Sequence, residues 1–139
     1  MLEENRDRNI CVADAIERAA KLYECGDAAA AINYASSFLE QYPDSAALHG
    51  YMAAALSLAG RLEEALVHAE RAVHLAPKSE KWSVVLTRTL WKADRRDDAF
   101  EEIKRYLAIS PSEIYSRMLR QWEVAESNLG GTNLPEHDP

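Results

Sequence analysis

AALHGYMAAALSLAGRLEEALVHAERAVHLAPKS, residues 46–79, is the stretch that decides the fold. It contains two apolar segments of helical periodicity, separated by a turn at Gly60 and closed by Pro77. Small residues such as Ala53 and Ala65 let two helices approach closely, while larger leucines fill the space between them. The stretch therefore predicts a hairpin of two packed helices.

The rest of the chain repeats this unit. Pro43, Pro77 and Pro111 are spaced 34 residues apart, and each follows a segment in which apolar residues recur with a helical period. A proline lacks an amide hydrogen and cannot continue a helix, so each one marks the end of a hairpin. We therefore expect three units, at residues 12–45, 46–79 and 80–113.

Each unit also carries a turn signal between its two helices. Gly26 and Gly60 stand at the turn in the first two units, and Asp94 takes this place in the third. Glycine adopts the left-handed conformation that ends a helix, and aspartate is among the few other residues that tolerate it. The three units thus share two helical segments, a turn residue between them and a proline after the second segment.

This pattern resembles the tetratricopeptide repeat family over residues 12–113. The resemblance implies an all-α, right-handed solenoid of helical hairpins with about seven helices, whose first helices line a concave groove that holds another polypeptide. Four residues depart from the family pattern. Ser83 stands where a large apolar residue is favoured, Thr87 where glycine or alanine is favoured, and Phe38 and Tyr106 where alanine is favoured.

One more helix is expected at residues 114–127, where apolar residues recur every three or four positions: Ile114, Tyr115, Met118, Leu119, Trp122 and Ala125. Such a helix would cap the open apolar side of the third unit. Residues 1–11 are expected to form an N-terminal segment, and residues 128–139 a flexible tail.

Composition agrees with one helical domain. Of 139 residues, 47% are hydrophobic, which is enough for a core, and five glycines and five prolines are few for a fold other than helical. No apolar run is long enough to span a bilayer, and residues 1–9 lack the apolar segment of a secretory signal. We therefore expect a cytoplasmic protein without membrane insertion. Cys11 and Cys25, about 21 Å apart along the first helix, are expected to be reduced.

The sequence predicts no enzyme, and neither a cofactor nor a metal site. His68 and His74 are six residues apart and face different sides of one helix, unlike metal ligands four residues apart. There is no glycine-rich phosphate loop and no CxxC pair. Three acidic pairs near the starts of second helices are expected to face the helix dipole and solvent: Glu63–Glu64, Asp97–Asp98 and Glu101–Glu102.

The net charge of −7 argues against nucleic acid as a partner. The charge is unevenly distributed, because residues 1–44 carry nine acids and four bases, whereas residues 78–111 carry six acids and eight bases. On the expected first helix of the third unit, Lys81, Arg88 and Lys92 recur on one face. A local basic surface is therefore expected there.

This basic face would continue a groove lined by small and apolar residues of the first two units. The expected groove residues are Ile16, Ala20, Tyr23, Gly50, Tyr51, Ala54, Lys81, Val85, Arg88, Trp91 and Lys92. Burial supplies most of the affinity of such contacts, while charge supplies register and association rate. The expected partner is a protein or peptide segment that is apolar and has an acidic stretch.

One subclass of tetratricopeptide grooves clamps the C-terminal carboxylate of chaperone peptides that end in Glu-Glu-Val-Asp. The corresponding positions hold Ile16, Ala20, Tyr51, Lys81 and Val85, of which only Lys81 matches. A carboxylate in an apolar groove loses hydration without regaining hydrogen bonds, so this peptide class is not expected.

Three functions stay open at this point. The leading one is an adaptor or scaffold that binds a partner segment in the groove. The second is a small dedicated chaperone, similar to the tetratricopeptide secretion chaperones that shield apolar segments of bacterial export substrates. The third is a regulatory subunit of an enzyme. Self-association into a homo-oligomer is compatible with all three, because exposed aromatic residues can bind a second copy as readily as a foreign partner.

Overall fold

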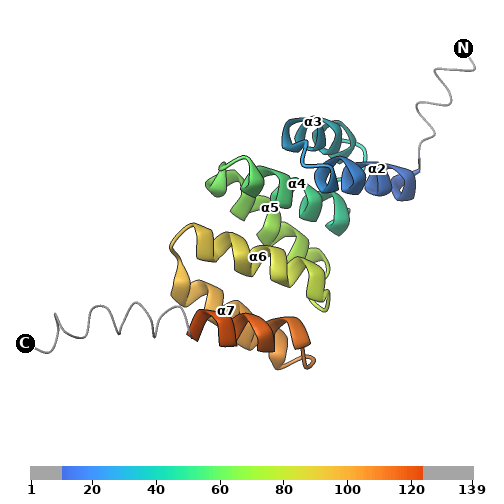
Figure 1. Cartoon of the computed structure of the whole chain (residues 1–139). Coiled ribbons are helices and arrows are strands. Elements are labelled where there is room, and N and C mark those ends of the chain that lie inside the picture. The colour runs from blue at the N-terminus through green and yellow to red at the C-terminus, as the bar shows by residue number, and fades with distance from the viewer. Residues whose placement is uncertain (1–10, 124–139) are drawn as a thin grey trace, which may run out of the picture.

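Helical hairpins follow one another through residues 11–123, the part of the chain that the computed structural model describes (Figure 1). The three pairs are α2 (Val12–Glu24) with α3 (Ala28–Leu39), α4 (Ala46–Leu58) with α5 (Leu62–Leu75), and α6 (Glu80–Lys92) with α7 (Arg96–Leu107). A last helix, called here the C-terminal helix, begins at residue 113 and runs to residue 123, where the described part ends. Seven helices and no strand within residues 11–123 confirm the expected all-α hairpin solenoid.

The turn signals act as the sequence indicates. Gly26 and Gly60 have φ angles of 82° and 81°, and Asp94 has a φ of 61°. At each turn the next residue donates its backbone N–H to the carbonyl of the residue five positions earlier, in the pattern that closes a helix C-terminus, as Arg61 does to Leu56. The predicted role of Asp94 in place of a glycine is therefore confirmed.

Serine caps begin the first helices of the second and third hairpins. The side chain of Ser45 accepts a hydrogen bond from the backbone of Leu48, and that of Ser79 accepts one from Trp82. Ser112 caps the C-terminal helix in the same way. Because the capping residue is Ser112, the C-terminal helix begins at residue 113, one residue before the start expected from the sequence. The expected residues 124–127 of this helix, residues 1–10 and the expected tail lie outside the described residues.

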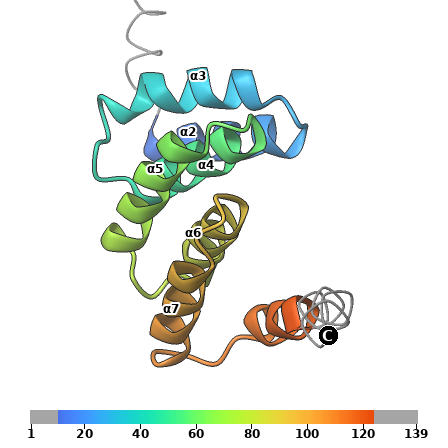
Figure 2. The ribbon, with the colours of Figure 1, turned by 90° about the vertical axis from the view of Figure 1, so that its left-hand side faces the viewer.

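The core consists of two apolar clusters. The main cluster runs from α2 to α7 and is rich in alanines with no exposed surface, including Ala53, Ala65 and Ala72. These alanines allow the close helix packing that the sequence predicts. A smaller cluster joins α6, α7 and the C-terminal helix through Val84, Ile103, Tyr106, Tyr115 and Met118. In Figure 2 the C-terminal helix lies beyond the third hairpin, at the opposite end of the molecule from α3.

Candidate partner-binding groove

Two adjoining hollows lie along the first helices of the three hairpins. The larger has a volume of about 410 Å³ and is lined by Tyr23, Tyr51, Ala54, Glu80, Lys81, Trp82, Val84, Val85, Arg88 and Ile114. The smaller, of about 110 Å³, is lined by Tyr23, Ala54, Ser57, Leu58, Val85, Arg88, Thr89 and Lys92. Because they share four residues, the two hollows form one continuous surface, called here the groove.

Most of the residues expected in the groove lie there. Seven of the eleven line one or both hollows: Tyr23, Tyr51, Ala54, Lys81, Val85, Arg88 and Lys92. They come from α2, α4 and α6, so the first helices do converge on one surface. Trp82 and Ile114 also line the larger hollow, although the sequence analysis did not place them in this surface.

Two of the other expected residues lie at the first hairpin. Ile16 lines a separate hollow with Val12 and Ala47, beside the loop that leads into α4. Ala20 is half-buried and packs against the main cluster. Neither residue is among those that line the groove.

Gly50 and Trp91 have packing roles. A Cβ atom on Gly50 would lie 2.2 Å from the ring of Trp82, so this glycine lets α4 and α6 approach each other. Trp91 stacks on Trp122 of the C-terminal helix, with ring centroids 3.8 Å apart, and meets the edge of Phe100. Both residues thus contact neighbouring helices, and neither lines the groove.

Aromatic rings form the floor of the larger hollow. Tyr51 packs edge-on against Trp82 at a centroid distance of 5.1 Å, and its side chain is almost entirely buried. Lys81 Nζ donates a hydrogen bond to the Tyr51 hydroxyl and lies 4.6 Å from the centroid of that ring. The charge of Lys81 is thus already engaged by a hydroxyl and by an aromatic face.

The cations at the other end of the groove are not engaged. Within residues 11–123, Arg88 and Lys92 form no ion pair, and both side chains are exposed. Elsewhere cations meet acids, as Arg61 meets Glu64 at 2.7 Å. Arg88 and Lys92 stand one helical turn apart on α6, so they can face the same anionic group.

A histidine pair in the second hairpin escaped the sequence analysis. Nδ1 of His49 lies 3.0 Å from Nδ1 of His68, and Nε2 of His49 lies 2.8 Å from the carbonyl oxygen of Pro43. Because a carbonyl only accepts, His49 donates through Nε2, and in the neutral pair His68 donates to His49. Burial lowers the pKa of His68, and the nearby His49 lowers it further, while Glu64 opposes the shift.

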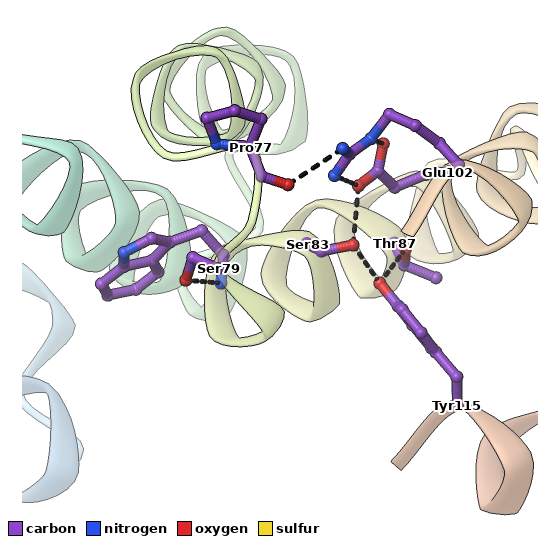
Figure 3. Close-up of polar contacts among 8 residues, drawn as sticks. Pro77, Ser79, Ser83, Thr87, Glu102 and Tyr115 are labelled. Carbon is purple, nitrogen blue, oxygen red and sulfur yellow. Dashed lines mark hydrogen bonds and ion pairs between the residues drawn. The ribbon is translucent and has the colours of Figure 1, made fainter. Parts of the chain in front are cut away.

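A buried polar cluster, called here the Tyr115 cluster, joins the third hairpin to the C-terminal helix (Figure 3). The Tyr115 hydroxyl lies 2.5 Å from Ser83 Oγ and 2.9 Å from Thr87 Oγ1, and Ser83 donates to Glu102 at 2.6 Å. Since Ser83 gives its only proton to Glu102, Tyr115 donates to Ser83 and Thr87 donates to Tyr115. Burial raises the pKa of the Tyr115 hydroxyl, so it keeps its proton at neutral pH.

The expectation that the acidic pair Glu101–Glu102 faces solvent is wrong for Glu102. Its side chain is 8% exposed and faces the interior instead of solvent. Arg105 donates to both of its carboxylate oxygens, at 2.8 and 2.7 Å, and also to the carbonyl of Pro77. The buried carboxylate is therefore paired and hydrogen-bonded, as a buried charge requires.

The histidine pair and the Tyr115 cluster occupy the same place in successive units. His49 and Ser83 are 34 residues apart, and so are His68 and Glu102. Each pair joins the first helix to the second. His49 donates to the carbonyl of Pro43, and Arg105, which pairs with Glu102, donates to the carbonyl of Pro77. The recurrence of polar residues at a spacing of 34 is the sequence signal that indicates the histidine pair and the Tyr115 cluster.

Within residues 11–123, no group of three or more histidine, cysteine, aspartate or glutamate side chains could hold a metal ion. Over the same residues, every helix is too short or too polar to cross a membrane. Cys11 and Cys25 are free and exposed at the two ends of α2.

Comparisons with known proteins support the fold. No family model matches the chain, and neither does any curated protein. Among solved structures, a piece of MamA from Desulfovibrio magneticus RS-1 superposes with a TM-score of 0.66 at 18% identity, covering 73% of this chain and 57% of that one. A double mutant of MamA RS-1 gives 0.65 at 18% identity, with 69% and 54% covered. MamA AMB-1 gives 0.63 at 18% identity, with 80% and 62% covered.

The chain thus spans little more than half of the first two of these neighbours. At this identity the likeness establishes a shared helical solenoid of the tetratricopeptide type. Partners and activity must be argued from the groove itself.

Proposed function

We propose that the protein is a protein-binding module, an adaptor or scaffold without enzyme activity, that holds a segment of another protein in the groove. One observation carries the proposal. An aromatic and aliphatic surface formed by α2, α4, α6 and the C-terminal helix ends at two exposed cations, Arg88 and Lys92, that have no acidic partner within residues 11–123. An apolar surface that ends at unpaired cations is typical of an interaction site.

The chemistry of the groove defines the partner segment. Its apolar side chains would pack against Ala54, Val85 and the edge of Trp82, since apolar burial supplies most of the affinity. Its acidic residues would face Arg88 and Lys92, where the two cations can pair with carboxylates. Lys81, already bonded to Tyr51, contributes to the apolar floor more than to charge recognition.

A site-specific photocrosslinker tests this proposal. A photoreactive phenylalanine analogue replaces Val85 in the groove and, in a matched variant, Val67 on α5, where the native side chain is 66% exposed. We expect the variant at 85 to crosslink, in cells, to a segment that carries both apolar and acidic residues. The variant at 67 should not crosslink to that segment.

The proposal fails if the two variants capture the same protein with equal yield, or if the segment captured at 85 lacks acidic residues. Capture at 85 must also be lost when Arg88 and Lys92 are both changed to glutamate. A capture that survives this change would come from a surface other than the groove.

A further inference from the structure

The C-terminal helix supplies a wall of the groove. Ile114, the second residue of this helix, lines the larger hollow together with Trp82 and Val84 of α6. The three first helices of the hairpins therefore do not complete the hollow by themselves. A side chain that enters the hollow would therefore meet Ile114 as well as the aromatic rings of its floor.

Tyr115, next in the chain, fixes this helix in place. Its side chain is fully buried, and its hydroxyl bonds with Ser83 and Thr87 on α6, the helix that also carries Trp82 (Figure 3). Apolar contacts are non-directional, whereas hydrogen bonds fix distance and direction. Because adjacent residues of a helix project about 100° apart, the anchoring of Tyr115 also sets the direction of Ile114.

We propose that Ile114 is a specificity-determining residue of the groove and that Tyr115 is the positioning residue that holds it there. The inference rests on the proposed function and adds to it the kind of side chain that the larger hollow selects. The selected side chain is a large apolar one, aromatic or long aliphatic, that packs between Ile114 and Trp82. It belongs to the same segment whose acidic residues face Arg88 and Lys92.

Two synthetic probes test the selection. The first is the peptide acetyl-Asp-Asp-Leu-Trp-Leu-Asp-Asp-amide, and the second replaces its tryptophan by alanine. Dissociation constants are measured by calorimetry at two salt concentrations. For the wild-type chain we expect the tryptophan probe to bind about tenfold more tightly than the alanine probe, as the loss of one large apolar anchor implies.

Ile114→Ala should reduce the ratio of the two dissociation constants, alanine probe over tryptophan probe, to about threefold or less. It should leave the salt dependence of binding unchanged, because Arg88 and Lys92 are intact. Ile109→Ala is the matched control, since Ile109 is 45% exposed and lines neither hollow. The control should keep the wild-type ratio.

Tyr115→Phe removes the hydroxyl and keeps the ring. We expect it to lower the ratio as well and to shift the Ile114 methyl signal in a ¹³C spectrum of the peptide-free protein. Tyr106→Phe is its control, because the Tyr106 hydroxyl has no hydrogen-bond partner within residues 11–123. A mere loss of stability would not move the Ile114 signal at a temperature well below unfolding.

The outcomes separate the two ideas. If the wild-type chain binds neither probe in a salt-dependent manner, the proposed partner chemistry is wrong and the inference falls with it. If the wild-type chain binds and discriminates but Ile114→Ala discriminates equally, only the role of Ile114 is overturned. If Ile114→Ala loses discrimination and Tyr115→Phe changes neither ratio nor methyl signal, the positioning role of Tyr115 is overturned.

Discussion

Single residues in this protein often have a role that the family pattern does not indicate. Ser83 and Thr87, which depart from the pattern, are fully buried, and both hydrogen-bond to Tyr115. Tyr106, another departure, packs edge-on against Tyr115 with ring centroids 5.8 Å apart. Three of the four departures therefore adapt the third hairpin to the helix that follows it.

Gly50 provides the sharpest test at this scale. Gly50→Ala would usually stabilise a helix by roughly 0.5–1 kcal/mol. Here the new Cβ would clash with the ring of Trp82, so we expect a loss of about 1–3 kcal/mol in the free energy of unfolding, as for other overpacked cores. Urea unfolding followed by circular dichroism measures the change. A gain in stability would show that α4 and α6 do not approach as closely as described.

The histidine pair predicts a dependence of stability on pH. The pKa of His68 is lower in the folded chain than its usual value of 6.5, so the unfolded chain binds more protons below that pH. Stability contributed by this site is complete well above 6.5 and decreases as the pH falls through 6.5 toward the lowered folded pKa. Urea unfolding measures the free energy of unfolding at pH 7.5 and 5.5. We expect this free energy to decrease less between the two pH values for His68→Gln than for the wild-type chain.

His74→Gln is the control, because His74 is exposed on the same helix. If this variant and His68→Gln respond alike to pH, the pair is not the source of the dependence. Glu64, one turn before His68, favours the protonated form, so Glu64→Gln should strengthen the dependence.

At the scale of elements, periodicity was a reliable guide where a signal recurs. The prolines, the turn residues and the alanines repeat at 34 residues, and the hairpins, the left-handed turns and the close packing follow from them. The stacking of Trp91 could not be predicted in this way, because its partner Trp122 belongs to a helix outside the repeat. The start of that helix was placed one residue late for the same reason.

Removing the C-terminal helix is the test at this scale. A chain that ends at residue 111 should expose Val84, Ile103 and Tyr106, which Tyr115 and Met118 cover in the full chain. We expect it to aggregate or to bind an apolar dye, because a solenoid end needs a polar outer face. A chain that ends at residue 129 should behave like the full chain. Equal behaviour of the two would exclude a capping role.

At the scale of the whole molecule, the charge distribution predicts how binding responds to salt. Arg88→Glu with Lys92→Glu should slow association with the crosslinked segment by about tenfold or more at low salt and weaken its salt dependence. Arg71→Glu with Lys104→Glu changes the net charge equally on α5 and α7, away from the groove. Stopped-flow fluorescence should show a much smaller effect for this second pair, and equal effects would indicate a response to net charge alone.

The two apolar clusters meet on α6, and this arrangement has a mechanical consequence. Trp82, Leu86 and Leu90 point into the main cluster, whereas Val84 points into the smaller one. Tension applied through the C-terminus would load the stack of Trp122 on Trp91 first and the small cluster next, and the C-terminal helix could peel away while α6 stays anchored by its other side. The larger hollow would then lose Ile114 while the hairpins stay folded, so a tether attached at that end could loosen the grip on a partner by pulling.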